Sequence, residues 1–206
     1  MHGHSASSTL TDIFRVQSVR ELSRGAYVVR TDRHAIDFEP GQHIIVGPSD
    51  DINMREYSVY SSPKDDYLEI LVKEVEDGYV SPRLRRLQVG EPVTIQGPMG
   101  YFLLAEEMRA RPLLFVATGT GVSPFRSFVR SYPTLDYTLL HGVRYADEAY
   151  DRESYDPERH VLCVSREEPR QDAGAAMYHG RVTDYLRKHP ADPASACFLC
   201  GNCDMI

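Results

Sequence analysis

A cationic and an aromatic side chain stand two positions apart in the segment Arg55-Glu56-Tyr57-Ser58-Val59-Tyr60-Ser61-Ser62. Its aromatic, β-branched and hydroxyl residues, closed by Ser62-Pro63, predict a strand. On a strand, Arg55 and Tyr57 point to the same side, about 6.6 Å apart. A forked cation then stands beside a flat ring, which suits a cofactor with a planar ring and a phosphate tail. A surface strand with solvated side chains explains the segment at least as well, so later motifs must decide.

A second glycine- and hydroxyl-rich motif, Ala117-Thr118-Gly119-Thr120-Gly121-Val122-Ser123-Pro124, follows an apolar run and opens a predicted helix. Gly119 and Gly121 permit close backbone approach, Ser123 is a candidate cap, and Pro124 suits the first helical position. These are the physical requirements for holding a pyrophosphate at a helix N-terminus. Pro124 stands where the GxGxxG fingerprint has its third glycine, and a purely structural strand-to-helix turn is the alternative.

Three arginines follow predicted strands or begin a helix in the second half of the chain, namely Arg144, Arg166 and Arg181. Together, they would suit a 2′-phosphate, with Ser165 in support. Sites for the non-phosphorylated cofactor often place a carboxylate near the first of these positions, and Asp147 and Glu148 do follow closely. Each arginine taken singly is as readily a solvated surface charge.

The four cysteines are Cys163, Cys197, Cys200 and Cys203, and the last three have C-x2-C-x2-C spacing. We reject an iron–sulfur cluster because Cys197 to Cys200 fall within a predicted strand and no fourth cysteine follows. Cys200, at the carboxyl end of that strand beside Gly201, is where ligands meet parallel sheets. No metal site is expected; His2 and His4 are interpreted as part of a solvated terminus.

Composition places the chain among ordinary globular proteins, with 206 residues, 42% of them apolar and 26% charged. The net charge, 23 − 30 = −7, disfavours nucleic acid as a general partner. No apolar run reaches the length of a membrane span, and the N-terminus lacks the features of a signal peptide. We therefore expect a cytoplasmic protein with no membrane association.

Short alternating segments separated by Gly and Pro turns fill residues 9–104 and predict a small antiparallel barrel. The predicted strands are 14–19, 26–30, 42–47, 55–62, 67–75 and 92–97. Within this half, residues 78–87 predict a helix with Ser81 at its N-cap and Pro82 after it. A phosphate would sit comfortably at that helix start, although a plain connecting helix fits equally well.

The pattern changes after the polar segment 105–112, which we interpret as an inter-domain linker. Buried apolar runs then alternate with helical patterns, which predicts a parallel α/β sheet over residues 112–206. The predicted strands are 113–117, 137–142, 160–165 and 196–201, and the predicted helices are 123–129 and 181–188.

Four motifs in this order give the chain a specific resemblance from about Phe14 onward. They are Arg55-x-Tyr57-Ser58-x-x-Ser61, Gly78-x-x-Ser81, Gly119-Thr120-Gly121-x-x-Pro124 and Cys200-Gly201-x-x-x-Met205. The set resembles the ferredoxin–NADP+ reductase family. Ser81-Pro82-Arg83-Leu84, Val164-Ser165-Arg166-Glu167 and Leu199-Cys200-Gly201-Asn202 are most similar to its bacterial branch, the ferredoxin/flavodoxin reductases.

The resemblance implies an N-terminal Greek-key barrel that binds FAD, over residues 9–104, and a C-terminal α/β domain that binds NADP, over residues 112–206. It implies that Arg55 holds the FAD phosphates, Tyr57 stacks on the isoalloxazine ring and Ser58 lies near flavin N5. Ser81 would bind the pyrophosphate, which favours FAD over FMN.

The same resemblance implies an NADPH site. Its residues would be Thr118, Gly119, Thr120, Gly121, Arg144, Ser165, Arg166 and Arg181. Cys200 would line the nicotinamide pocket, so Ser58 and Cys200 are the residues expected nearest the reacting atoms. Family members usually continue through a further helix to a segment that covers the second flavin face, and we expect that segment to be missing here. The last strand should then be poorly buried.

The expected function is transfer of hydride between NADPH and FAD, and of single electrons to ferredoxin or flavodoxin, by a monomer. Such partners are usually acidic, so Arg83, Arg85 and Arg86 are candidates for a basic docking face. Two alternatives stay open: an NAD(P)H-dependent reductase component of an oxygenase or a free-flavin reductase, and a non-catalytic flavin-binding sensor. The sequence alone does not name the acceptor, the direction of electron flow or the oligomeric state.

Overall fold

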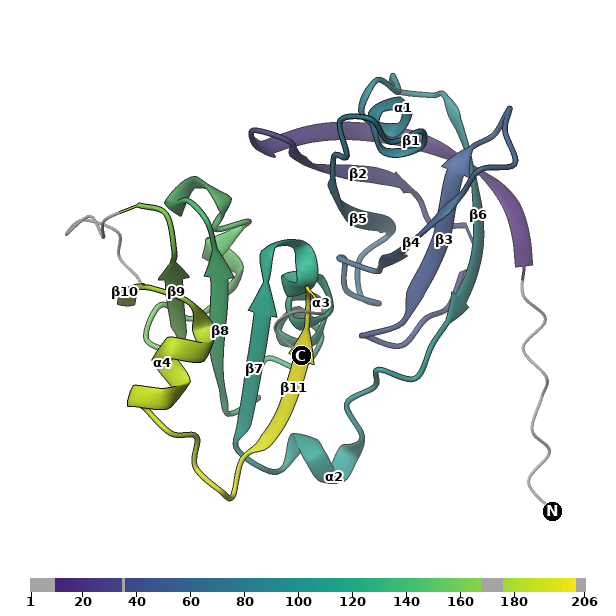
Figure 1. The fold of residues 1–206 in the computed structure, drawn as a ribbon. Helices are drawn as coiled ribbons and strands as arrows, with labels where there is room; N and C mark the ends of the chain where they lie inside the picture. The colour runs from purple at the N-terminus through teal and green to yellow at the C-terminus, as the bar shows by residue number, and fades with distance from the viewer. Residues whose placement is uncertain (1–9, 35, 168–175, 203–206) are drawn as a thin grey trace, which may run out of the picture.

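The computed structural model describes residues 10–34, 36–167 and 176–202, and it contains two sheets side by side (Figure 1). The first is a six-stranded sheet in which every described pair is antiparallel. The second has five strands, all parallel. The predicted fold class, an antiparallel barrel followed by a parallel α/β sheet, is confirmed. Among the described residues, none of the helices is long and apolar enough to cross a membrane.

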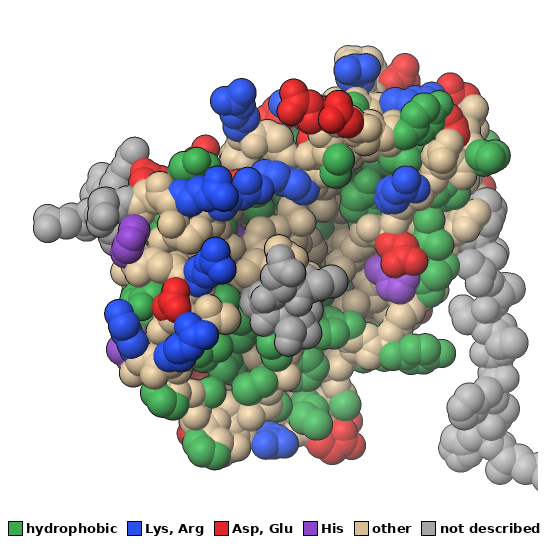
Figure 2. All heavy atoms as spheres, in the orientation of Figure 1, with side chains coloured by type: hydrophobic (Ala, Val, Ile, Leu, Met, Phe, Trp, Pro, Cys, Tyr) green, Lys and Arg blue, Asp and Glu red, His purple; other side chains and the backbone are tan. Residues whose placement is uncertain are grey.

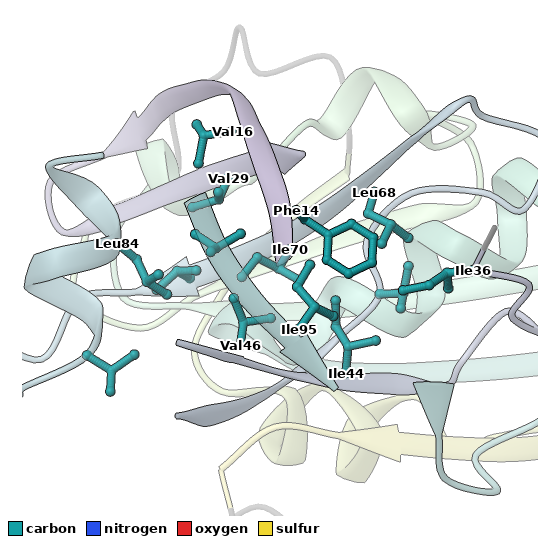
Figure 3. Packing of buried hydrophobic residues seen from close by; sticks show 14 of the residues in the cluster. Phe14, Val16, Val29, Ile36, Ile44, Val46, Leu68, Ile70, Leu84 and Ile95 are labelled. Carbon is teal, nitrogen blue, oxygen red and sulfur yellow. The ribbon is translucent and has the colours of Figure 1, made fainter. Parts of the chain in front are cut away.

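The first sheet curls into a barrel with its strands in the order β4-β3-β6-β1-β2-β5. Its elements are β1 (Leu10–Ser23), β2 (Ala26–Asp32), β3 (His43–Pro48), β4 (Arg55–Ser58), β5 (Tyr67–Lys73), α1 (Ser81–Arg85) and β6 (Pro92–Met99). The return of β6 between β1 and β3 is the Greek-key crossing. Inward-facing side chains such as Phe14, Ile44, Ile70 and Ile95 meet in the barrel's core (Figure 3).

The predicted strand 55–62 is too long, because β4 ends at Ser58. The backbone then leaves β3 and turns to β5 on the other side. Val59 forms a bridge with Ile70, and the Tyr60 N–H donates to the Glu69 carbonyl at 2.7 Å. This change of partner closes the barrel, so the second half of the segment serves closure rather than extending β4.

The second sheet has the strand order β10-β9-β8-β7-β11. Its half of the chain holds α2 (Glu106–Arg109), β7 (Leu113–Thr118), the 3-10 turn η1 (Gly119–Val122), α3 (Ser123–Ser131), β8 (Tyr137–Val143), the 3-10 turns η2 (Ala146–Glu148) and η3 (Arg152–Ser154), β9 (His160–Val164), β10 (Ala176–His179), α4 (Val182–Lys188) and β11 (Ala196–Cys200). Since β8 lies on one side of β7 and β11 on the other, the order reverses at β7. That reversal creates a crevice at the carboxyl ends of β7 and β11.

Three local expectations differ from the structure. The linker segment contains the helical turn α2. The strand β10 was not predicted, because its four residues, Ala-Met-Tyr-His, are too short and mixed to show a period. Ser123 is not a cap: Val122 holds that position, and the Ser123 hydroxyl donates to the Thr120 carbonyl at 2.7 Å. The turn η1 runs directly into α3, so no free helix start remains for Ser123 to cap.

A buried arginine joins the barrel to the α/β sheet. Arg126 of α3 is 7% exposed, and its guanidinium donates to the Tyr60 carbonyl at 2.9 Å and to Glu69 Oε2 at 3.1 Å. Glu69 is 1% exposed and also accepts two hydrogen bonds from Arg30. Nearby, Arg20 of the barrel makes a bidentate pair with Asp151, at 2.8 and 2.7 Å. The two halves therefore meet through ion pairs in which Arg126, Glu69 and Asp151 are buried, while Arg20 and Arg30 remain partly exposed.

Hydroxyl groups and apolar side chains complete this contact. Ser127 donates to the Ser61 carbonyl at 2.7 Å, and the Ser62 and Ser131 hydroxyls lie 3.0 Å apart. One hydrophobic cluster also crosses the boundary, since Val28 and Leu71 from the barrel belong to it with residues of the α/β sheet. We infer that α3 keeps a fixed position against the segment that follows β4.

The edge strand β11 alternates between half-buried and exposed residues. Cys197 is exposed and Leu199 is 39% exposed on one face. On the other face, Phe198 contacts Phe102 and Phe115, with ring centroids 5.7 and 6.1 Å away. This aromatic contact holds β11 beside β7.

Two histidines lie buried under the second sheet. His141 of β8 is 0% exposed and His160 of β9 is 2% exposed, with ring centroids 6.0 Å apart. Burial lowers the pKa of His141 to about 4 and that of His160 to about 3. Both rings are therefore neutral at physiological pH.

Replacement of Arg126 by Met should destabilise the protein by about 3 kcal/mol, because Glu69 loses a buried partner. Arg159→Met is the matched control: Arg159 pairs at the surface with Asp136, so its loss should cost less than about 1 kcal/mol. Urea unfolding of both variants measures the difference. If both variants lost the same free energy of unfolding, the buried pair of Arg126 and Glu69 would not be what holds the two halves together.

Stability should fall as the pH drops from 7 to 5, because the unfolded chain protonates these histidines near pH 6.5 while the native rings stay neutral. Each native pKa is depressed, so the contribution is present above the unfolded pKa and is lost on acidification, at about 2 kcal/mol per histidine by pH 5. His160→Gln should remove about half of that loss in urea titrations at pH 7, 6 and 5. His189→Gln, which replaces an exposed histidine, is the control for the substitution itself.

Candidate functional site

A cleft of about 760 Å³ opens between the barrel and the carboxyl edge of the parallel sheet. Its lining includes the following predicted site residues: Tyr57, Ser58, Thr118, Gly119, Thr120, Gly121, Arg144, Ser165, Arg166, Arg181 and Cys200. Residues more than 140 positions apart in the sequence thus share one cavity. The volume lies within the range of cofactor and small-molecule sites.

Two loops meet at the reversal point of the sheet, one after β7 and one after β11. A Cβ atom on Gly121 would lie 2.3 Å from the Cys200 carbonyl oxygen, and one on Gly201 would lie 2.1 Å from Thr118 Oγ1. The Asn202 N–H donates to that same hydroxyl at 2.9 Å. Glycine is therefore required at both positions because the backbones of the loops touch.

Gly119 has a different role from these two glycines. Its φ is +52°, in the left-handed region, and a Cβ atom there would meet nothing within 4 Å. No side chain covers the Gly119 backbone where it borders the cleft. This leaves room for a ligand against the turn η1 and the start of α3. A phosphate group there would face the first N–H groups of η1, at the positive end of the helix dipole.

The three predicted arginines stand on the same side of the cleft, after β8, after β9 and before α4. Arg144, Arg166 and Arg181 are all exposed. Among the described residues, none of their guanidinium groups has a hydrogen-bond or carboxylate partner. Figure 2 shows Lys and Arg side chains gathered above the hollow between the two sheets. The site therefore offers a concentrated positive charge that an anionic group would neutralise.

Of the two sequence candidates for a ribose-binding carboxylate, Asp147 does not line the cleft and Glu148 is already engaged. It is 8% exposed, accepts the Arg144 N–H at 2.9 Å, and pairs with Lys73 of the barrel at 3.2 Å. These partners lower the pKa of its carboxyl group despite the burial. Glu148 shapes the loop that carries Arg144, so the cleft presents cations rather than a free carboxylate at this point.

The barrel contributes Tyr57 and Ser58, at the end of β4. Tyr57 is half-buried, contacts the barrel's core, and has its pKa raised by burial to about 12, so the phenol stays neutral. One face of a rigid aromatic ring and a hydroxyl group thus border the cleft opposite the Thr118–Gly121 loop. This fits a flat ring system placed between the two.

Arg55 and Ser81 do not line this cleft. Arg55 is exposed and donates to the Met54 carbonyl at 2.7 Å. Ser81 is 6% exposed, and its hydroxyl accepts the Val75 N–H at 3.0 Å. The expected N-cap role of Ser81 is wrong: Val80 holds that position, because the Ser81 hydroxyl closes the turn before α1 instead.

Cys200 is half-buried at the carboxyl end of β11, and burial raises the pKa of its thiol. The neutral thiol borders the cleft beside Gly201. Cys203 lies outside the described residues, as do His2 and His4. Within the described part of the chain, no cluster of His, Cys, Asp and Glu has the geometry to hold a metal ion.

The expected basic docking face is largely neutralised by neighbours. Arg83 pairs with Asp50 at 2.6 Å and with Asp51 at 2.7 Å. Arg85 pairs with Glu21 at 2.7 Å and with Glu74. Only Arg86 of the three lacks a carboxylate partner among the described residues.

Several cleft residues were not among the expected site residues, for example Lys73, Tyr150 and Cys163. Lys73 closes an alternating strand and looks like an ordinary solvated end. Cys163 lies within an apolar run whose pattern shows only burial, although its place near the carboxyl end of a parallel strand was an available signal. Tyr150 follows a mixed polar segment that shows no period.

The residues of this cleft fit the two groups that the sequence implied. A dinucleotide with an extra phosphate would fit on the α/β side of the cleft. Gly119 leaves room for it, the loops after β7 and β11 border it, and the three unpaired guanidinium groups would bind the phosphate. A half-buried tyrosine with a neighbouring serine suits a flavin ring. Bound there, a flavin and a nicotinamide would supply hydride and electron transfer, while the protein positions them.

Comparisons with known proteins agree with this geometry. Residues 14–103 match the family of oxidoreductase FAD-binding domains, and residues 115–206 match that of oxidoreductase NAD-binding domains. Among solved structures, a ferredoxin NADP+ reductase from Neisseria gonorrhoeae with bound FAD and NADP has a similar fold. Its TM-score is 0.81 at 22% identity, over 95% of this chain and 87% of that one.

Two relatives illustrate the range of sequence matches. Ferredoxin–NADP reductase B of Sorangium cellulosum is 31% identical over 201 residues, 89% of this chain and 80% of its own length. Reductase component 2 of terephthalate 1,2-dioxygenase from Comamonas is 31% identical over 164 residues, 74% of this chain and 47% of its own. The chain spans about half the length of several other curated relatives it matches. The chain belongs to the ferredoxin–NADP+ reductase family of FAD- and nicotinamide-nucleotide-binding oxidoreductases.

Proposed function

We propose that this protein is a ferredoxin/flavodoxin–NADP+ reductase that passes hydride between NADPH and FAD and single electrons to ferredoxin or flavodoxin. One observation carries the proposal: a single cleft joins an aromatic-hydroxyl pair, Tyr57 and Ser58, to a bare glycine loop and three unpaired arginines. A flavin alone would not need the arginine group. A nicotinamide nucleotide alone would not need the half-buried ring.

Each residue has a part in the proposed site. Tyr57 stacks on the isoalloxazine ring, with Ser58 near flavin N5 and Cys200 against the nicotinamide. The Thr118–Gly121 loop holds the NADPH pyrophosphate. The residues proposed for the 2′-phosphate are Arg144, Ser165, Arg166 and Arg181.

The remaining FAD contacts are proposed from the resemblance. Arg55 would hold the FAD phosphates, and Ser81 the pyrophosphate, by rotating its hydroxyl hydrogen outward while it still accepts the Val75 N–H. We propose the barrel, residues 9–104, as the FAD domain and residues 112–206 as the NADP domain. We also propose that the protein is a monomer. A cytoplasmic location is proposed because Cys163 and Cys200 are free thiols, which a reducing compartment preserves.

The purified protein should be yellow, release FAD on denaturation, and oxidise NADPH with an artificial electron acceptor. Mass spectrometry of the released flavin and stopped-flow reduction with NADPH test this directly. A colourless protein with no NADPH oxidation would overturn the proposal. Bound FAD without turnover would favour the non-catalytic sensor instead.

The arginine group should set the preference for NADPH over NADH. Because hydrogen bonds to charged groups contribute about 1.5–3 kcal/mol, Arg144→Ala or Arg166→Ala should each lower the NADPH/NADH ratio of kcat/KM by roughly 10- to 100-fold. Arg187→Ala is the control, because Arg187 is exposed, paired with Asp184 and absent from the cleft.

The second candidate function is that of a reductase component serving an oxygenase, favoured by the match to such a component. The same steady-state assay separates the two. A wild-type preference for NADH, unaffected by either arginine substitution, would support the oxygenase partner and contradict the proposed role of Arg144 and Arg166.

A further inference from the structure

The left-handed glycine of the cleft loop has a buried partner. His141 Nε2 lies 2.9 Å from the Gly119 carbonyl oxygen. The contact follows from strand register, because Ala117 of β7 pairs with His141 of β8 and Gly119 comes just beyond the end of β7. His141 itself lies outside the lining of the cleft, one layer beneath the loop.

The chemistry of this pair assigns the proton. A carbonyl oxygen can only accept, so Nε2 must carry the hydrogen. His141 Nδ1 is then an acceptor, and it is buried without a hydrogen-bond partner among the described residues. An apolar side chain of similar size would avoid that unsatisfied atom, whereas an imidazole is favourable here through its bond to Gly119.

Fixing the Gly119 carbonyl also fixes the next N–H. In a trans peptide the C=O and the following N–H point in opposite directions. With the Gly119 oxygen held inward by His141, the Thr120 N–H points away from the buried ring, to the side where Gly119 and Thr120 line the cleft. Thr120 is the second residue of η1, and the first N–H groups of a helix have no acceptor within that helix.

We propose that His141 is a positioning residue for the dinucleotide: its Nε2–H holds the Gly119–Thr120 peptide so that the Thr120 N–H faces the nucleotide's pyrophosphate. This inference rests on the proposed function, because it needs a pyrophosphate in the cleft. Without the imidazole, the Gly119–Thr120 peptide is free to rotate, because Gly119 has open space on one side. The Thr120 N–H then points away from the pyrophosphate for part of the time.

Neighbouring groups offer a matched comparison. His160 is also buried and its ring centroid lies 6.0 Å from that of His141, but its Nε2 has no hydrogen-bond partner among the described residues. Tyr150 and Glu148 also lie near the His141 ring. A general effect of imidazole burial on stability would therefore appear in both histidines, whereas a positioning effect belongs to His141 alone.

The test compares His141→Gln, His141→Asn and His141→Leu with His160→Leu, all as flavin-loaded protein. The glutamine amide reaches the place of Nε2, while the asparagine amide stops one carbon short. The Kd for NADP+ is taken from the flavin difference spectrum. Adenosine 2′-monophosphate, which carries the 2′-phosphate but no pyrophosphate, serves as the second ligand.

We expect His141→Asn and His141→Leu to weaken NADP+ binding by roughly 3- to 10-fold, with the change in KM rather than kcat, and His141→Gln to stay close to the wild type. Binding of adenosine 2′-monophosphate should not change in any variant. Should His141→Leu not fold, the Gln and Asn variants decide the matter.

Two results would overturn the inference: equal NADP+ affinities for His141→Gln and His141→Asn, or the same loss in His160→Leu. A wild-type protein that binds no NADP+ would instead contradict the proposed function, so the two failures can be told apart.

Discussion

A guanidinium group buried between the barrel and the α/β sheet fixes how the two halves meet. Arg126 sits in α3, the helix that the nucleotide loop leads into, and its partners are the Tyr60 carbonyl and Glu69 on the barrel. Removing these charges from water is unfavourable unless every partner stays in place. The barrel and the α/β sheet can therefore shift little relative to each other. The cleft between them keeps its shape because Arg126 joins its two sides.

This constraint connects the chain's two chemical segments. The segment that begins with Arg55 supplies Tyr57 and Ser58 to the cleft and then, from Val59 onward, closes the barrel and contacts α3. Residues 55–62 thus line one side of the cleft and also contact α3, which positions the loop on the opposite side. In hydride transfer between two bound rings, such a fixed distance is what the protein itself contributes.

Within the α/β half, hydrogen bonds from three side chains shape the loops around the cleft. Glu148 holds the Arg144 loop from behind, Thr118 ties the two glycine loops together, and His141 supports Gly119. The exposed arginines stay unpaired, and Glu148, the cleft-lining carboxylate close to Arg144, pairs with Lys73 instead. Thr118 and Glu148 also line the cleft, whereas His141 supports the loop from outside its lining, and residue type gave no sign of that role.

The sequence by itself determined the two-part fold, since period-two alternation and long apolar runs report directly which faces are buried. It also determined most of the cleft, because glycines and cations after parallel strands must gather at one edge of the sheet. Only the tertiary structure decided that β4 ends at Ser58, that Ser81 and Ser123 do not cap their helices, and that Arg55 and Ser81 stand apart from the cleft. It also revealed the partners of Arg126 and His141. Those outcomes depend on which group satisfies a given hydrogen bond. The local pattern does not identify that partner, whether it is 3 residues away, as for Ser123 and Thr120, or 57 residues away, as for Arg126 and Glu69.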